Sequence, residues 1–197
     1  KHITQHIGVP DMVFHELISD KIHIDIHMIN PTKDRDFYTL VTSGMSQKPM
    51  SVPDGAEDYK FAELMLCLPP SWEMDQEKWS NENHYFPIRL LKFLARLPHN
   101  YSTWLSYYHT IPNGNPPLPY ATNTALCGAM IFVPVLFPQE FHKLELNKQK
   151  TVCFYNVIPL YESEMNLKLS EGSTALIERL EVARVTELLN VSRKNTV

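Results

Sequence analysis

Residues 21–32 read KIHIDIHMINPT, in which polar and aliphatic side chains alternate as far as Met28. Successive side chains of a β-strand point to opposite faces, so the alternation predicts a strand over residues 21–29 with one face in the core. The core face would carry Ile22, Ile24, Ile26 and Met28. The other face would carry His23, Asp25 and His27. Two histidines beside an aspartate raise the question of whether this strand binds a metal ion.

The polar face of this strand allows three interpretations. Alternate strand residues lie about 6.5–7 Å apart, so His23, Asp25 and His27 could converge on one ion, and zinc accepts imidazole ligands. The same row could form a partner-binding face. We favour the third interpretation, in which hydrogen bonds to a neighbouring loop or helix hold the polar side chains. The sequence therefore leaves the metal site as the alternative.

A first hairpin is predicted around this strand. MVFHELI, residues 12–18, is the preceding strand candidate, and Ser19-Asp20 is the turn candidate. A two-residue turn would place Glu16 opposite His23 on the same face, where it could add a ligand to a metal site.

The remaining pattern predicts an α+β fold. Further strands are expected over residues 37–45, 59–69, 126–136 and 151–161, with helices over residues 85–97 and from Ser173 or Thr174 to about Asn190. Strands come first, then a helix, more strands and a final helix. This order favours a mixed, mostly antiparallel central sheet with helices packed on its faces. No boundary divides residues 1–197, so we expect a single domain.

Several segments are less sharply defined by the sequence. Residues 103–111 fit a strand or a short helix, and residues 111–120 are expected to be an irregular loop. Pro98 is expected to end the first long helix. The last six residues, SRKNTV, are expected to fray.

Composition excludes several classes of protein. The 197 residues are 44% hydrophobic and carry a net charge of −4, with scattered Lys and Arg, which argues against nucleic-acid binding. No apolar run approaches the roughly 18 residues that span a bilayer. The three cysteines lie in apolar contexts without a C-x-x-C motif, which is typical of reduced, buried thiols in a cytoplasmic protein.

Two short motifs could suggest catalysis. Thr42-Ser43-Gly44-Met45-Ser46 contains two serines, but it is not G-x-S-x-G and no strand-to-helix elbow follows it. We interpret it as a strand end at which Gly44 adopts a conformation barred to other residues. Glu162 and Glu164 are more consistent with the start of a helix, where acidic groups suit the dipole, than with a catalytic pair.

Five stretches in order resemble the suppressor of fused family. They are HIDIHMINPTKDRDFYTLVTSGMSQKPM (23–50), YKFAELMLCLPPSW (59–72), PIRLLKFLARLPH (87–99), TVCFYNVIPLYESEM (151–165) and ALIERL (175–180). The most specific pieces are the aromatic strand that runs into Ser-Gly-Met-Ser and the Pro-Leu-Tyr-x-x-Glu block. The chain is most similar to the stand-alone bacterial form, which resembles only the N-terminal domain of the animal protein.

The resemblance implies a mixed sheet flanked by helices and a role in protein binding. The animal protein clamps an extended peptide of a transcription factor with help from a second domain. We expect no counterpart of that domain within these 197 residues, so the clamp is not expected as a whole. Bacterial relatives are thought to be immunity proteins that neutralise a toxin. The residues that match the family pattern, and so are candidates for folding or partner binding, are Asp25, Thr42, Gly44, Met45, Ser46, Tyr161 and Glu164.

The preferred hypothesis is thus a cytoplasmic, non-enzymatic domain that binds a protein partner without a cofactor, nucleic acid or membrane. In the immunity role this partner would be a toxin. The first alternative is a metal-dependent enzyme that uses His23, Asp25 and His27, with help from Glu16. The second is a homo-oligomeric scaffold whose partner is another copy of the chain.

Overall fold

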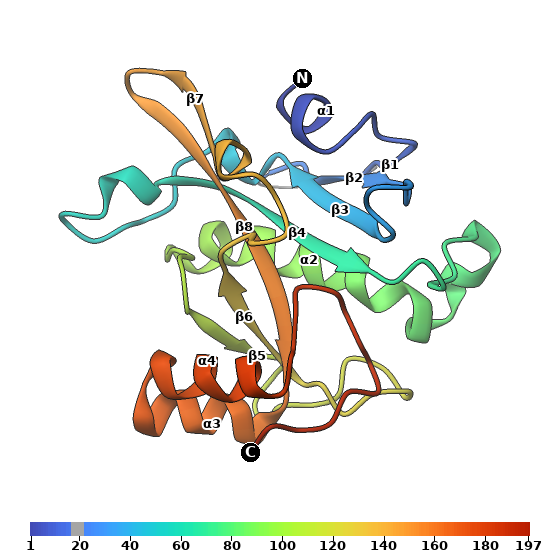
Figure 1. The fold of residues 1–197 in the computed structure, drawn as a ribbon. Coiled ribbons are helices and arrows are strands. Elements are labelled where there is room, and N and C mark those ends of the chain that lie inside the picture. The colour runs from blue at the N-terminus through green and yellow to red at the C-terminus, as the bar shows by residue number, and fades with distance from the viewer. Residues whose placement is uncertain (17–21) are drawn as a thin grey trace.

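The computed structural model describes residues 1–16 and 22–197. Its described residues form an eight-stranded sheet in the order β1-β2-β3-β4-β8-β6-β5, and β7 also pairs with β8 (Figure 1). The strands are β1 (Met12–Phe14), β2 (Asp25–Ile29), β3 (Tyr38–Ser43), β4 (Phe61–Leu68), β5 (Thr110–Pro112), β6 (Gly128–Phe132), β7 (Lys143–Asn147) and β8 (Lys150–Leu160). The helices are α1 (His2–His6), α2 (Glu82–Tyr101), α3 (Glu162–Glu171) and α4 (Ser173–Val182). Short 3-10 turns cover Met45–Gln47, Glu57–Tyr59, Gln76–Ser80 and Gln139–Phe141.

The sheet is mixed because β4 and β8 run parallel at its centre, whereas the other registered pairs are antiparallel. Both central strands are buried on two faces, as their continuous apolar sequences predict. This arrangement confirms the predicted α+β class with a mostly antiparallel sheet.

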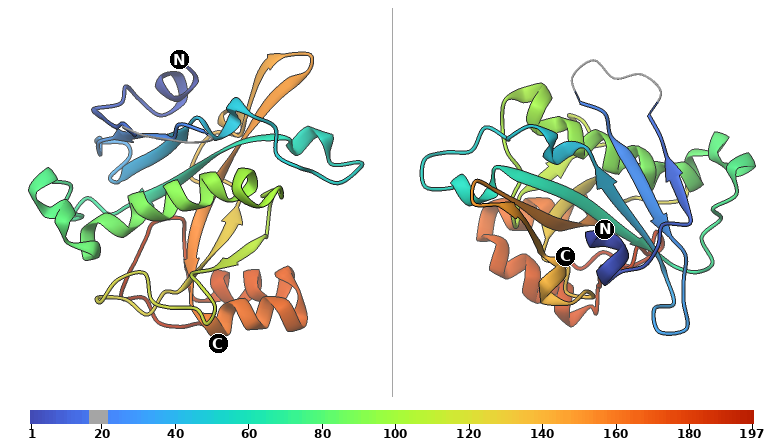
Figure 2. Two further views of the ribbon diagram at one scale, coloured as in Figure 1. Left: turned by 180° about the vertical axis from the view of Figure 1, so that it is seen from behind. Right: turned by 90° about the horizontal axis from the view of Figure 1, so that it is seen from above.

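Helix α2 covers one face of the sheet and crosses it behind the view of Figure 1, as the left panel of Figure 2 shows. Its buried residues, among them Phe86, Leu90 and Leu94, join one core cluster with the side chains of β2, β3, β4 and β8. Ile22, Ile24, Ile26 and Met28 belong to this cluster and are each at most 4% exposed. The predicted core face of residues 21–29 is therefore confirmed.

The opposite face of the sheet is covered in two places. Near the N-terminus, α1 and the turn at Gln139–Phe141 cover a cluster that includes Val41 and Phe154. At the other end, α3 and α4 pack side by side over a cluster that includes Met130 and Leu176 (Figure 1). Between these two covers lies the part of the face that the C-terminal segment crosses. Among the described residues, no helix has both the length and the apolar character needed to cross a membrane.

The first hairpin differs from the prediction. Phe14 pairs with Ile26, so the predicted register, with Glu16 opposite His23, is wrong by one residue. The strands are also shorter than predicted, because side chains replace the ladder at this end: the Glu16 N–H donates to Asp25 Oδ1 (3.2 Å) and the Ile24 N–H donates to Glu16 Oε2 (3.0 Å). The predicted turn at Ser19-Asp20 lies outside the described residues.

Helix α2 is longer than predicted. Pro98 does not end it, and the helix continues to Tyr101 before Ser102 takes a left-handed conformation (φ 49°). A proline removes only one backbone donor, and here the Thr103 N–H closes the last turn by donating to the Pro98 carbonyl (3.0 Å). Residues 104–109 form neither a strand nor a helix. β5 begins at Thr110, at the end of the segment predicted as strand or short helix, and extends to Pro112 in the predicted irregular loop.

The C-terminal segment departs most from the prediction. Helix α4 ends at Val182 rather than near Asn190, and its N-cap is Gly172, without a side-chain cap from Ser173 or Thr174. Residues 183–193, here called the C-terminal strap, instead extend across the sheet. Leu188 lies in a parallel bridge beside Cys67, where β4 has diverged from β8. This pairing satisfies a carbonyl of β4, because the Leu189 N–H donates to Cys67 O (2.9 Å).

Candidate partner-binding surface and its polar centres

The Thr42–Ser46 motif is organised around a carboxylate that the sequence analysis did not single out. Glu63, on β4, is 4% exposed and accepts four hydrogen bonds. Its donors are the Thr42 hydroxyl (2.7 Å), the Gly44 N–H (3.0 Å), and the N–H (3.0 Å) and hydroxyl (2.7 Å) of Ser46. Burial raises the pKa of the Glu63 carboxyl, although the hydrogen bonds from Ser46 and Thr42 act in the opposite direction. The Thr42–Ser46 motif thus supplies the hydrogen-bond donors of a buried polar centre around Glu63.

Gly44 is required at this turn for two reasons. Its φ of 115° is a backbone conformation that other residues rarely adopt, which confirms the predicted special conformation. A Cβ at this position would also lie 1.8 Å from the carbonyl oxygen of His23 on the neighbouring strand. Met45 follows it and is fully buried, and its carbonyl lies 3.0 Å from His99 Nε2 on α2.

Tyr161 and Glu164 form a second polar centre at the start of α3. Glu164 is fully buried and pairs with Arg193 through two contacts, Nη1–Oε1 at 2.6 Å and Nη2–Oε2 at 2.5 Å. Its carboxylate also accepts the Tyr161 N–H (2.9 Å) and the N–H and hydroxyl of Thr196. The predicted start of a helix at Glu162 is confirmed. The expected fraying of residues 192–197 is wrong, because this tail supplies the partners of a buried charge.

The predicted trio on the polar face of β2 does not come together. His27 Nε2 lies 2.8 Å from the Ser43 hydroxyl, and its Nδ1 is buried without a hydrogen-bond partner in the described structure. His23 Nε2 lies 3.0 Å from Asp25 Oδ1, and His15 Nδ1 lies 3.1 Å from Asp25 Oδ2. Glu16 points elsewhere and forms an ion pair with Arg96. The structure therefore groups His15, rather than His27 or Glu16, with His23 and Asp25.

The Ser43–His27 pair lines a pocket of about 300 Å³ between α1 and the β7–β8 hairpin. Burial lowers the pKa of the His27 imidazole, which favours its neutral form. In a serine hydrolase a third group orients the imidazole through its other nitrogen. None of the described residues does so for His27, so this pair is consistent with a structural hydrogen bond between β2 and β3.

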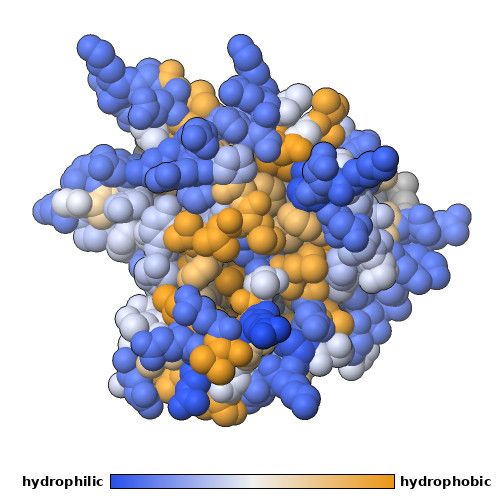
Figure 3. Space-filling model, viewed as in Figure 1, coloured by the Kyte–Doolittle hydropathy of each residue, from blue (hydrophilic) through white to orange (hydrophobic). Residues whose placement is uncertain are grey.

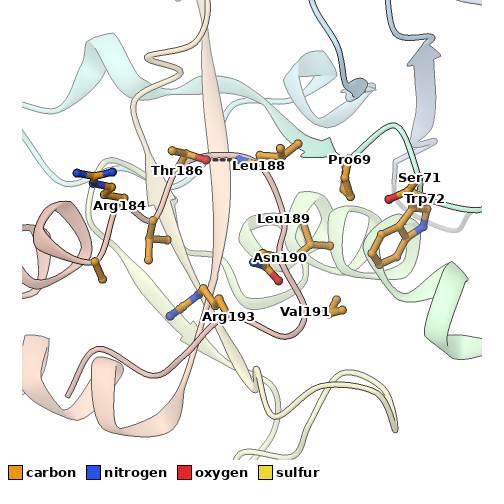
Figure 4. A pocket seen from close by; sticks show the side chains of 12 residues that line it. Pro69, Ser71, Trp72, Arg184, Thr186, Leu188, Leu189, Asn190, Val191 and Arg193 are labelled. Atoms are coloured by element: carbon orange, nitrogen blue, oxygen red, sulfur yellow. Dashed lines mark hydrogen bonds between the residues drawn. The ribbon is translucent and has the colours of Figure 1, made fainter.

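A larger pocket, of about 530 Å³, lies beside the C-terminal strap (Figure 4). Pro69, Ser71 and Trp72 line one side of it, and the strap lines the other (Figure 4). Arg184, the second residue of the strap, has a left-handed conformation (φ 55°), which turns the chain away from α4. The pocket is therefore bounded by a segment that a single β-bridge joins to β4.

Apolar side chains gather at the centre of the face that carries this strap, above α3 and α4 (Figure 3). In the loop over residues 133–138, Val135 is 64% exposed and Leu136 is 45% exposed. The backbone N–H of Leu136 donates to the Glu187 carboxylate of the strap (2.5 Å). The exposed apolar loop and the strap are thus one connected surface.

Glu187 makes this connection sensitive to pH. Burial raises its carboxyl pKa from 4.5 to about 7. The folded state then holds the proton more tightly than the unfolded chain, so stability is lost as the pH rises from 4.5 through about 7.

Replacing Glu187 by Gln should remove this loss. At pH 8, Glu187→Gln should raise the free energy of unfolding by on the order of 1 kcal/mol, with little difference from the wild type at pH 5. Urea denaturation at both values of pH measures the effect. Glu178→Gln, which alters an exposed carboxylate on α4, is the control. An equal effect of Glu187→Gln at both values of pH would contradict the prediction.

The sequence matches the Suppressor of fused protein (SUFU) family over residues 20–194. The chain belongs to the suppressor of fused family. Among solved structures, it is similar to a SUFU homologue from Neisseria gonorrhoeae, with a TM-score of 0.69, 18% identity, and coverage of 100% of this chain and 93% of that chain. It is also similar to a chain of the Sufu–Fu complex, with a TM-score of 0.67, 15% identity, and coverage of 99% and 89%. No curated protein matches the sequence.

Drosophila Suppressor of Fused is similar over part of its length only. The TM-score is 0.65 at 12% identity, and the match covers 99% of this chain and 48% of that one. The present chain therefore corresponds to about half of the Drosophila protein. The likeness to these structures shows that the SUFU fold is shared.

The polar centres of this SUFU chain include residues that the sequence analysis missed. Glu63 is the one charged residue in the apolar strand FAELMLCL, and a lone charge in such a strand is a usable signal. Glu187 carries a weaker signal, because Leu188 and Leu189 follow it but Thr186 precedes it. Arg193 carries no such signal, because its neighbours in the sequence are mostly polar. His15 carries none, because the strand in which it lies is ambiguous. The three cysteines are free and buried, as predicted, and burial raises the pKa of each thiol.

Proposed function

We propose that this SUFU chain is a non-enzymatic, cytoplasmic protein-binding domain that neutralises a cognate toxin by occlusion, covering a site on the toxin or trapping a segment of it. The observation that carries the proposal is the apolar surface on the face that holds the strap (Figure 3). Exposed Val135 and Leu136 lie in a loop that is hydrogen-bonded to the strap, and the strap lines a pocket of about 530 Å³. Exposed apolar patches of this kind mark interaction sites.

The family supports a protein as the partner. One structural relative is a chain of the Sufu–Fu complex, so the same fold is present in a protein assembly. A toxin as the partner rests on the resemblance to the stand-alone bacterial form. The net charge of −4 favours a basic toxin, because complementary charge speeds association.

The family-pattern residues divide between folding and contact in this proposal. Thr42, Met45 and Glu164 are fully buried, so they would act by shaping the fold. Partner contact would come from the loop over residues 133–138 and from the strap. This division gives a sharp test, because exposed apolar residues can be changed without touching either polar centre.

Leu136→Asp should weaken toxin binding at least about tenfold, because a charge at the centre of an apolar interface must be desolvated without a partner. The control is Phe93→Asp on α2, on the opposite side of the sheet, since Phe93 is 44% exposed and Leu136 is 45% exposed. Co-purification with the toxin encoded beside this gene, and calorimetry of the complex, measure binding. Equal weakening by both substitutions would refute this surface.

A separate assay tests immunity. Cells that express the toxin should survive with the wild-type chain or Phe93→Asp, and should fail with Leu136→Asp. If growth in the presence of the toxin is unaffected by deleting this protein, the immunity role fails. Binding without protection would retain the protein-binding function and exclude occlusion of the toxic site.

A further inference from the structure

Three metal-ligating side chains meet at the end of the first hairpin where the chain leaves β1 and enters β2. His15 follows β1, Asp25 begins β2, and His23 lies two residues before Asp25 on the same face. The described ligand atoms of His15, His23 and Asp25 all lie within 4.8 Å of one another. The two imidazoles approach different oxygens of one carboxylate, with Oδ2 near His15 and Oδ1 near His23.

From this geometry we propose that His15, His23 and Asp25 form a Zn²⁺-binding site. Zinc takes imidazole nitrogens and carboxylate oxygens at about 2.0–2.2 Å, which gives a tetrahedron with edges of roughly 3.3 Å. His23 Nε2 lies 3.0 Å from Asp25 Oδ1 and His15 Nδ1 lies 3.1 Å from Asp25 Oδ2, and one ligand atom from each of the three residues lies within 4.8 Å of the other two. Three ligands can therefore close on an ion with small side-chain movements.

The surroundings of the carboxylate favour such a site. The Glu16 N–H donates to Asp25 Oδ1 (3.2 Å) and so orients the ligand from outside the coordination shell, as partners around metal ligands commonly do. The side chains of His15 and His23 are 68% and 45% exposed, which leaves the fourth position open to water. A neutral imidazole can bind the ion when its proton sits on the other ring nitrogen.

The site differs from the metal site predicted from the sequence, because cross-strand pairing replaces His27 with His15. Phe14 pairs with Ile26, so continuing this register by one step brings His15 beside Asp25. Zinc would then link the two strands of the hairpin at the end where the ladder hydrogen bonds stop. The proposal concerns binding and is independent of the toxin-binding surface.

Titration of the full-length chain with ZnCl₂ tests the site, but a second histidine pair must be removed first. The rings of His2 and His6 on α1 lie 4.6 Å apart and could chelate zinc separately. Calorimetry is therefore done on His6→Ala, which should bind one Zn²⁺ per chain at this site. MgCl₂ should not compete, because Mg²⁺ prefers oxygen ligands in an octahedral shell.

Adding His15→Ala or His23→Ala to this background should weaken zinc binding at least about tenfold. The control is His84→Ala, which removes an imidazole that lies 3.5 Å from a single carboxylate, that of Glu73. In NMR spectra, Co²⁺ should broaden the ring protons of His15 and His23 and leave those of His84 unchanged. The site is refuted if His6→Ala does not bind zinc, or if the affinity is the same with and without His15 and His23.

Discussion

Glu63→Ala is expected to lower the free energy of unfolding by about 4 kcal/mol, because it leaves two buried and two half-buried donors without their acceptor. Two of these donors are backbone N–H groups, at Gly44 and Ser46, and two are the hydroxyls of Thr42 and Ser46. The backbone donors cannot turn toward water without moving the strand end. Urea denaturation at neutral pH measures the loss.

Two graded variants show whether the carboxylate acts as the acceptor of the whole turn. Glu63→Gln keeps one oxygen, which can still serve Gly44 and Ser46, so it should cost clearly less than Glu63→Ala. Ser46→Ala removes one donor and leaves the acceptor satisfied by the others, so it should cost about 1 kcal/mol. If Glu63→Ala were no more damaging than Ser46→Ala, the buried centre would not organise the Thr42–Ser46 turn.

This result would explain why this specific family motif has the sequence Ser-Gly-Met-Ser. The Ser-Gly-Met-Ser block could have marked a nucleophile or a binding loop. In the fold, its hydroxyls and N–H groups converge on Glu63, and Gly44 provides the close approach to His23. The resemblance to the family at these positions therefore reflects the way in which the Thr42–Ser46 turn is hydrogen-bonded to the sheet.

Local sequence patterns predicted the parts of the fold that depend on residues close together in the sequence. The alternation of residues 21–29 predicted a core face correctly. Successive side chains of a strand point to opposite faces, so only one face of this segment is apolar. The strand predicted over residues 151–161 corresponds to β8, and the apolar residues on both of its faces fit its central place in the sheet. β7 was missed, although Leu144 and Leu146 alternate with polar residues ahead of a turn at residues 148–149.

Contacts between distant residues could not be derived in this way. The hairpin register depended on the residues that flank the turn, where hydrogen bonds from Glu16 and Ile24 to side chains replace the ladder. A shift of one residue exchanged the ligand candidates. The strap was predicted as helix because local propensity favours one. The bridge of Leu188 to Cys67 instead outweighs that propensity, and no local signal encodes a partner 121 positions away.

The tail provides the second large effect. Arg193→Met is expected to lower the free energy of unfolding by about 3–5 kcal/mol at pH 7, because it leaves the Glu164 charge buried and unpaired. Glu164 is fully buried, whereas the Lys78–Glu73 pair is about half exposed on both sides. Lys78→Met is thus the matched control and should change stability by less than about 1 kcal/mol.

The pH dependence of this effect identifies its cause. Burial alone would raise the pKa of Glu164, but hydrogen bonds and the charge of Arg193 outweigh it and hold the pKa below 4.5. The stabilisation is therefore present above pH 4.5 and is lost as the pH falls through the lower, folded-state pKa. The difference between wild type and Arg193→Met should be largest near neutral pH and shrink in acid, where the carboxyl can be protonated.

A double variant separates the buried charge from simple loss of packing. Glu164→Gln with Arg193→Met removes both charges, so it should be more stable at pH 7 than Arg193→Met alone. Arg193 also lies 4.8 Å from the Tyr161 ring and donates to Pro159 O, and these contacts stay lost in the double variant. Recovery should therefore be partial. If the two variants were equally unstable at every pH, the tail would contribute by packing and the Glu164–Arg193 charge pair would not anchor it.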